Sequence, residues 1–257
     1  MFRVTEPLEL DDFLSWQPPK LVPIISDGLM YTGTRVIIYG KYKSLKSMLA
    51  IRFCVNVCRG KDWLGFQTEK SSVMYLQLEI PNQMLQVRMV KMISSKEPHE
   101  PFYIWTEPTI KIDTDLGYKR IEEALVKSKP KILVIDPIYK IMSGDMLETR
   151  HVQDLVDWID KLIEKYQISV VLVHHSRKGY TAGGQDKDES FGNSDDMLGS
   201  VVFSAWADSI IKIERKKDKE ILVRFDVVRH AERELSPRYF DVDIDTLDFK
   251  QNIGRKI

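Results

Sequence analysis

Eight consecutive residues in the N-terminal part of the chain have the types and spacing of a phosphate-binding loop. They are Gly40, Lys41, Tyr42, Lys43, Ser44, Leu45, Lys46 and Ser47. Such a loop connects a strand to a helix, and its backbone N–H groups and the helix N-terminus face the anion. A lysine near its end contacts the β- and γ-phosphates, and the hydroxyl that follows holds Mg²⁺. We expect Lys46 and Ser47 to have these roles, with Met48 completing the nucleotide site.

Leu45 departs from the pattern, because glycine normally stands at this position and lets the backbone approach the phosphates closely. Two interpretations remain open: the loop has lost its nucleotide, or it tolerates a side chain that points away. A degenerate pattern of this kind is also compatible with a lysine-rich strand–helix turn that binds no ligand. Its position between a strong strand at 35–39 and an apolar helical pattern from residue 46 favours a phosphate loop.

Two acidic residues follow predicted strands and complete the expected site. Asp136 ends the apolar run 131–136, and a carboxylate there can reach the Mg²⁺ shell that Ser47 holds. Asp-Pro is also a simple turn signal. Glu79 ends the strand at 73–78, and we expect it to polarise the attacking water. Glu79 could instead cap the helix that begins near Pro81.

Two histidines, His174 and His175, follow another apolar run at 170–173. A polar side chain here can contact the γ-phosphate and report the nucleotide state to the next loop. An incomplete metal site and a purely structural pair are the alternatives. Neighbouring residues of a strand point to opposite faces, so only one should face the ligand, and we expect it to be His174.

The elements that must position these residues alternate between strand and helix. The helix at 151–166 has apolar residues at three- and four-residue steps, and the strand at 168–173 is apolar without alternation, as in a buried parallel sheet. The segments near 208–215, 220–229 and 238–243 indicate antiparallel strands. The pattern predicts an α/β fold with a mainly parallel, helix-covered sheet and antiparallel C-terminal strands. Residues 1–30 are predicted to be an N-terminal arm or lead-in segment, and 31–257 one domain.

Composition narrows the class of protein. A chain of 257 residues can form one α/β domain, and its formal net charge of zero means that any nucleic-acid contact must be local. Cys54 and Cys58 have no partners at zinc spacing, which favours buried thiols in a reducing compartment. The N-terminus lacks a signal-peptide pattern and the apolar runs are shorter than a membrane span. We therefore expect a soluble, cytoplasmic protein with no membrane partner.

The order of these motifs, from about Gly28 onward, resembles the RecA-like P-loop ATPases of the RepA and DnaB type, the hexameric replicative helicase group. The small RepA-like ATPases of plasmids, phages and other mobile elements are the most similar. The resemblance implies ATP and Mg²⁺ as cofactors and a hexameric ring of identical subunits. It also implies single-stranded or forked DNA as partner, a helicase role in DNA replication, and a separate primase-polymerase for any priming.

The resemblance also implies roles for individual residues. Glu79 corresponds to the catalytic carboxylate, and His174 or its neighbour to the residue that senses the γ-phosphate. An arginine from the adjacent subunit completes each site in this group; Arg229 is expected here, with Arg215, Arg224 and Arg233 as competitors. Such an arginine contributes about 10³–10⁵ in rate.

DNA-contacting loops of the group correspond to residues 177–198, where Arg177 and Lys178 are the expected contacts. The same loop carries five acidic residues that would repel phosphates. A disordered surface loop that does not contact DNA is therefore the alternative. Two other functions stay open. A nucleotide-dependent switch or recombination-mediator scaffold is favoured by Leu45 and the neutral charge. A small-molecule kinase is disfavoured, because no acceptor lid rich in arginine is evident.

Overall fold

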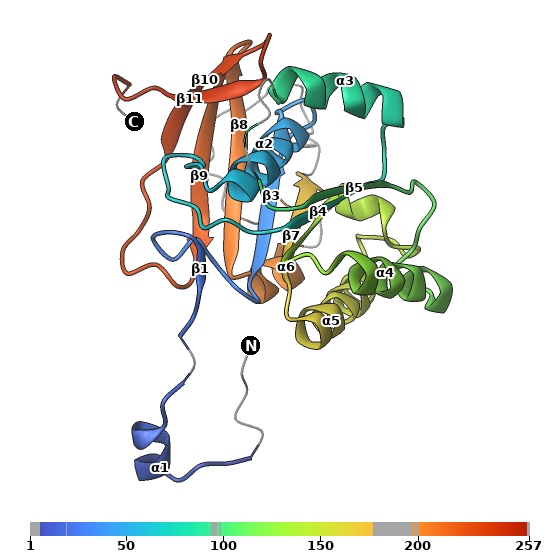
Figure 1. Ribbon diagram of the computed structural model, residues 1–257, viewed down its shortest axis with the longest axis vertical. Helices are drawn as coiled ribbons and strands as arrows, with labels where there is room; N and C mark the ends of the chain where they lie inside the picture. Colours follow the sequence, from blue (N-terminus) through green and yellow to red (C-terminus); the bar gives the residue numbers. More distant parts are fainter. Residues whose placement is uncertain are drawn as a thin grey trace, which may run out of the picture.

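A nine-stranded sheet runs through the molecule, with helices on both faces (Figure 1). The structure is a computed structural model and describes residues 6–18, 20–93, 97, 99–176, 197 and 200–255. The strand order is β11-β10-β9-β8-β3-β7-β6-β4-β5. Six of these strands are parallel: β3 (Arg35–Gly40), β4 (Val73–Gln77), β5 (Phe102–Thr106), β6 (Ile132–Asp136), β7 (Ser169–His175) and β8 (Ser209–Lys217). The antiparallel remainder is β9 (Glu220–Val228), β10 (Arg238–Asp243) and β11 (Asp248–Gln251).

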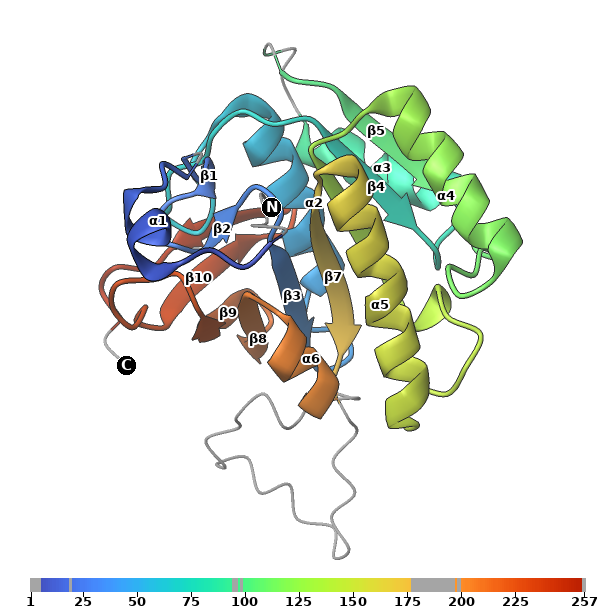
Figure 2. The ribbon, with the colours of Figure 1, turned by 90° about the horizontal axis from the view of Figure 1, so that it is seen from below.

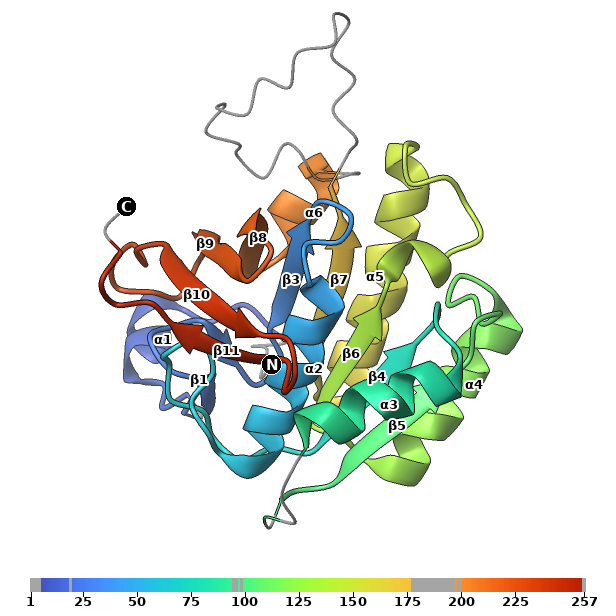
Figure 3. The same ribbon diagram turned by 90° about the horizontal axis from the view of Figure 1, so that it is seen from above.

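The helices form two layers. On one face lie α2 (Lys46–Arg59) and α3 (Asn82–Met92), seen in front of the sheet in Figure 3. On the other lie α4 (Asp115–Ser128), α5 (Thr149–Tyr166) and α6 (Ser200–Trp206), of which α5 and α6 are in front in Figure 2. A short 3-10 helix, η1 (Ile138–Lys140), follows β6.

Alternate residues of the central strands enter the two cores. In β3, Val36 and Ile38 pack toward α2, whereas Ile37 and Tyr39 pack toward α5. Because both faces are covered, these strands are apolar at nearly every position. The predicted apolar stripe of α5 is buried, and the helix begins at Thr149, two residues earlier than the sequence pattern indicates.

The α/β fold predicted from the sequence is confirmed, with antiparallel strands at its C-terminal end. The predicted antiparallel strand at 208–215 corresponds to β8, which pairs antiparallel with β9 but parallel with β3. β11 has no counterpart among the predicted strands. Part of the predicted lead-in segment belongs to the core, because β1 (Pro23–Ile25) and β2 (Met30–Tyr31) contribute buried Ile24, Ile25 and Met30. Within the described residues of this segment, α1 (Leu10–Ser15) stands apart from the body (Figure 1).

Cys54 and Cys58 are buried, unpaired thiols in α2. Burial raises the pKa of Cys58 to about 12, so it stays protonated and inert at neutral pH. Among the described helices, none combines the length and apolarity needed to cross a bilayer.

Candidate active site

The carboxyl ends of β3, β4, β6 and β7 meet at one edge of the sheet, where open α/β sheets bind ligands. A pocket of about 370 Å³ lies at this edge. Its walls come from the phosphate loop, β4 and the turn after it, α3, β6, β7 and β8. The lining residues are Tyr42, Lys43, Ser44, Leu45, Lys46, Ser47, Met48, Tyr75, Gln77, Glu79, Ile80, Arg88, Asp136, His175 and Arg215.

The loop joins the end of β3 to the start of α2, as a phosphate loop does, although Leu45 stands where glycine is expected. Leu45 has φ 70° and ψ 19°, the left-handed conformation, directly before α2 begins at Lys46. This conformation costs a non-glycine residue about 1–2 kcal/mol. The Leu45 side chain packs against the core on the α2 side of the sheet, which offsets part of that cost. The geometry therefore agrees with a loop that tolerates the leucine.

Lys46 is buried and folded back on the loop. Its Nζ donates to the carbonyl oxygen of Lys41 at 2.7 Å and to Oγ of Ser44 at 3.4 Å. Burial lowers the pKa of Lys46 to about 8, and the nearby charges of Asp136 and Glu79 oppose this shift. A phosphate in the pocket would offer this ammonium group a stronger partner than the loop carbonyl.

Asp136 and Ser47 both line the pocket and contact each other. The Asp136 carboxylate is buried, accepts a 2.6 Å hydrogen bond from the Tyr75 hydroxyl and is hydrogen-bonded to Ser47. Burial raises the pKa of Asp136, while these two hydrogen bonds lower it. A carboxylate beside a hydroxyl is a hard-oxygen donor set, and it fits Mg²⁺ with phosphate oxygens and waters as further ligands.

Glu79 lines the pocket from the turn after β4. Its Oε1 accepts a hydrogen bond from the Tyr139 hydroxyl at 3.2 Å. The alternative role as a helix cap is not supported, because Pro81 is the N-cap of α3 and no side-chain cap bond is formed there. The carboxylate is thus presented to the same pocket as Lys46 and Asp136.

His175, not His174, lines the pocket. The expectation for His174 is wrong in its choice of face: its side chain is buried and its ring lies 5.2 Å from that of Phe203 in α6. His175 lies with its ring 5.6 Å from Tyr139 and 6.3 Å from Tyr42. Burial lowers the pKa of His175, and the positive charge of Lys46 lowers it further. The neutral imidazole can therefore accept or donate a hydrogen bond at neutral pH.

Arg229 is exposed, and its guanidinium is hydrogen-bonded within its own chain. Its guanidinium donates to three backbone carbonyls at the end of α6: Ser204 at 3.0 Å, Ala205 at 2.7 Å and Ala207 at 2.9 Å. These bonds satisfy carbonyls that a helix end leaves without partners. The expected DNA contacts, Arg177 and Lys178, lie outside the described residues.

Two arginines that the sequence analysis did not assign to the site line the pocket. Arg215, named only as a competitor for the arginine from a neighbour, lies at the end of β8 and donates to the Lys43 carbonyl at 3.4 Å. Arg88 comes from α3. The parallel pairing of β8 with β3 brings Arg215 beside the loop, and a sequence pattern that indicates only a hairpin cannot reveal that pairing.

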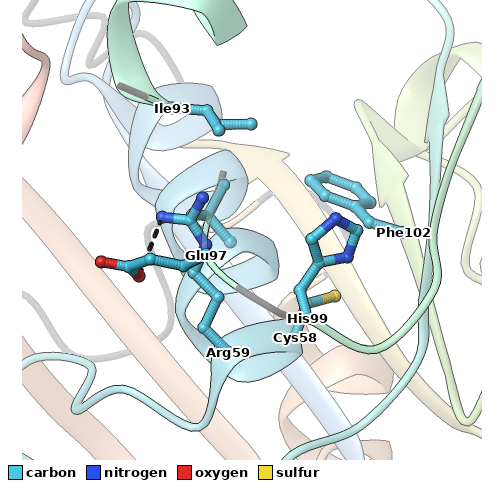
Figure 4. A pocket seen from close by; sticks show the side chains of 7 residues that line it. Cys58, Arg59, Ile93, Glu97, His99 and Phe102 are labelled. Atoms are coloured by element: carbon cyan, nitrogen blue, oxygen red, sulfur yellow. Dashed lines mark ion pairs between the residues drawn. The ribbon is translucent and has the colours of Figure 1, made fainter. Parts of the chain in front are cut away.

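A second pocket, of about 300 Å³, lies at the opposite end of α2 (Figure 4). Its labelled residues include Cys58, His99 and Phe102, and an ion pair joins Arg59 to Glu97 at 3.5 Å. The lining of this second pocket is mainly apolar. Its lining residues do not include the combination of a lysine, a hydroxyl and two carboxylates found in the phosphate-loop pocket.

Comparisons with known proteins agree with this geometry. A family model described as an AAA domain matches residues 3–180. A solved structure described as the ATPase domain of G40P superposes with a TM-score of 0.64 at 12% sequence identity, covering 86% of this chain and 85% of that one. No curated protein has a significantly similar sequence. The RecA-like ATPase fold predicted from the motif order is thereby confirmed, and the chain belongs to the AAA domain family.

Proposed function

We propose that the protein hydrolyses ATP in a Mg²⁺-dependent reaction coupled to DNA binding or translocation. The observation that carries the proposal is the convergence of Lys46, Ser47, Asp136 and Glu79 on one pocket at the carboxyl edge of the sheet. Lys46 supplies a positive charge for the phosphates, and Ser47 and Asp136 supply a hydroxyl and a carboxylate that can hold a hard metal ion. Glu79 supplies a carboxylate that can orient the attacking water. A P-loop ATPase needs this set.

The residues divide the chemistry among them. Backbone N–H groups of the loop and Lys46 would hold the β- and γ-phosphates, while Ser47 and Asp136 would hold Mg²⁺. Bound Mg²⁺ would neutralise part of the phosphate charge. Glu79, oriented by Tyr139, would accept a hydrogen bond from the attacking water and later its proton. Arg215 would add positive charge beside the loop within the same chain.

The finer functional assignment rests on the RecA-like fold and the motif order. We propose a homo-oligomeric ring, a hexamer by analogy, that acts on single-stranded or forked DNA in the cytoplasm as a replicative-helicase-like motor of a mobile element. His175 would report the state of the γ-phosphate to the residues after β7, where Arg177 and Lys178 would contact DNA. A separate primase-polymerase would supply primers.

One observation favours a second function, a nucleotide-dependent switch or recombination-mediator scaffold. Leu45 holds a strained conformation where an efficient phosphate loop has glycine. A switch would bind ATP and DNA without strand displacement, so a forked-duplex unwinding assay separates the two proposals.

Steady-state ATP hydrolysis with and without single-stranded DNA tests the leading proposal. We expect Lys46→Ala to lose ATP binding, and Glu79→Gln to keep binding while turnover falls by about 10²–10⁴-fold. Lys127→Ala and Glu123→Gln, at exposed positions of α4, are the matched controls and should behave as wild type. A Glu79→Gln chain that turns over at the wild-type rate would remove Glu79 from the mechanism. If the wild-type protein binds ATP but does not hydrolyse it, the result would support the second function, the nucleotide-dependent switch.

A further inference from the structure

Gln77, the last residue of β4, lines the phosphate-loop pocket and has no role in the chemistry described above. The residue is 3% exposed, and its Oε1 accepts no hydrogen bond within the part of the chain that the structure describes. A buried acceptor without a partner is unfavourable, because it has given up its hydrogen bonds to water. Such atoms are rare in folded proteins, and one that lines a pocket indicates a bound molecule that donates to it.

The sheet holds Gln77 beside the acidic residue of the proposed metal site. In the parallel pairing of β4 with β6, Gln77 lies opposite Asp136, and both belong to the face of the sheet that α2 and α3 cover (Figure 3). Neighbouring strands are about 4.8 Å apart. A small ligand bound at Asp136 therefore lies within reach of the Gln77 amide.

The chemistry of the site identifies the missing donor. Phosphate oxygens accept hydrogen bonds and cannot satisfy another acceptor such as Oε1. Mg²⁺ held by one or two protein ligands keeps several of its waters, and those waters are hydrogen-bond donors. The Asp136 carboxylate already accepts a hydrogen bond from Tyr75 at 2.6 Å and is hydrogen-bonded to Ser47. A metal-bound water next to Asp136 therefore needs a further acceptor, and Gln77 offers one.

We propose that Gln77 is a positioning residue for the metal ion, whose Oε1 accepts a hydrogen bond from a Mg²⁺-bound water beside Asp136. The inference rests on the proposed ATPase site and adds a residue to it. Gln77 fixes the orientation of that water, and through the water the position of the ion. In the free protein the same oxygen weakens the fold, and binding of the hydrated ion supplies its partner.

Thr106 provides a matched comparison on the other side of Gln77. It lies opposite Gln77 in the pairing of β4 with β5, and its Oγ1 is likewise buried without a partner among the described residues. Thr106 is not one of the residues that line the pocket. Loss of its hydroxyl should therefore leave metal binding unchanged.

The experiment measures how Mg²⁺ changes the affinity for the non-hydrolysable β,γ-imido analogue of ATP, by isothermal titration calorimetry. Gln77→Met keeps the length and approximate volume of the side chain and removes the acceptor. Gln77→Glu keeps an acceptor oxygen at the same place. Thr106→Val removes the neighbouring hydroxyl and is the control.

We expect Gln77→Met to raise the dissociation constant of Mg²⁺ in the nucleotide complex by about tenfold, as for other residues that orient metal ligands. Affinity for the nucleotide without Mg²⁺ should stay within about twofold. Gln77→Glu should bind Mg²⁺ at least as tightly as wild type, because an acceptor remains and a negative charge is added near the cation. Thr106→Val should match wild type in both measurements.

Thermal unfolding without metal or nucleotide separates this role from a structural one. Gln77→Met should unfold at the same temperature as wild type or higher, because the buried acceptor without a partner is gone. Mg²⁺ and the nucleotide should then stabilise it less than they stabilise wild type. A side chain that only supported the sheet would show the reverse, with lower stability in the free protein and unchanged affinity for Mg²⁺.

Several results would overturn the proposal. Equal Mg²⁺ affinity in wild type and Gln77→Met would remove the contact with the water. Equal weakening in Gln77→Met and Gln77→Glu would assign the effect to the amide nitrogen. A loss of more than about a hundredfold would make Gln77 a direct ligand of the ion.

Failure of the proposed function itself would look different. The wild-type protein would then bind the nucleotide equally well with and without Mg²⁺, and Lys46→Ala would bind it as wild type does. That result would overturn the ATPase site and the role of Gln77 together. A wild-type protein that couples Mg²⁺ to the nucleotide, with Gln77→Met coupling them equally well, would overturn the role of Gln77 alone.

Discussion

Tyr139 shows how a single side chain can govern the geometry of the site. Its hydroxyl contacts Glu79 at 3.2 Å, and its ring lies beside that of His175. Burial and the charge of Glu79 raise the pKa of Tyr139 to about 12, so the phenol remains a hydrogen-bond donor throughout the neutral range. We infer that Tyr139 positions the carboxylate and does not itself touch the reacting atoms.

Tyr139→Phe should lower kcat by about tenfold, because a hydrogen bond to a charged group contributes about 1.5–3 kcal/mol and orientation matters most in the transition state. KM for ATP and the equilibrium affinity should stay within about twofold. The control is Tyr166→Phe, which removes a hydrogen bond to Glu122 far from the pocket. Equal losses in kcat and in ATP affinity would instead indicate that the site had collapsed.

The burial of Lys46 predicts a pH dependence of ATP binding. The pKa of Lys46 in the free protein is about 8, below its ordinary value of 10.5. Phosphates bound beside the ammonium group would favour its charged form and raise this pKa again. Below pH 8 the lysine is already protonated in the free protein, so binding takes up no proton there. Above pH 8 binding must take up a proton, and affinity falls by at most about tenfold per pH unit.

Isothermal titration at pH 7 and pH 9, in buffers with different ionisation enthalpies, measures this uptake. We expect no proton uptake by Lys46 at pH 7, and at pH 9 an uptake approaching one proton with weaker binding. Equal affinity at both pH values, with no buffer dependence at pH 9, would contradict the burial of Lys46 in the free state.

At the scale of elements, the end of α6 depends on a residue from a strand. α6 is seven residues long, and the Arg229 guanidinium, just after β9, donates to carbonyls at its end. A positive charge at a helix C-terminus also interacts favourably with the helix dipole. Phe203 of the same helix packs on His174, which neighbours the pocket residue His175. Arg229 can therefore affect the active site of its own subunit through α6.

Arg229→Ala should lower the free energy of unfolding by about 1–3 kcal/mol, because the last carbonyls of α6 lose their partners. Urea unfolding measures the loss, and hydrogen exchange should locate it at residues 200–207. Arg233→Ala, at an exposed position in the following turn, is the control. Unchanged stability together with lost ATP hydrolysis would favour the role in a neighbour's active site that the family resemblance implies.

The order of the strands explains which site residues could be predicted. Lys46, Ser47, Glu79 and Asp136 each follow a strong local pattern of strand followed by turn or helix, and such patterns depend only on nearby residues. The choice between His174 and His175 depends on which face of β7 meets the loop. That is fixed by the register with β3, in which Tyr39 pairs with His174 and Gly40 with His175.

At the scale of the whole molecule, the sequence by itself determined the fold class, the order of the motifs and most of the phosphate-loop pocket. Apolar periodicity and turn chemistry depend only on nearby residues. A parallel sheet brings the carboxyl ends of its strands to one edge in any strand order.

The tertiary structure alone decided the contacts between segments far apart in the chain. It placed Arg215 and Arg88 in the pocket, bound Arg229 to α6 and paired Tyr139 with Glu79. Each of these depends on strand order and packing, in which residues 195 positions apart meet, as Arg52 and Leu247 do. Local propensity carries no information about such pairs, because they form only when the whole sheet has assembled.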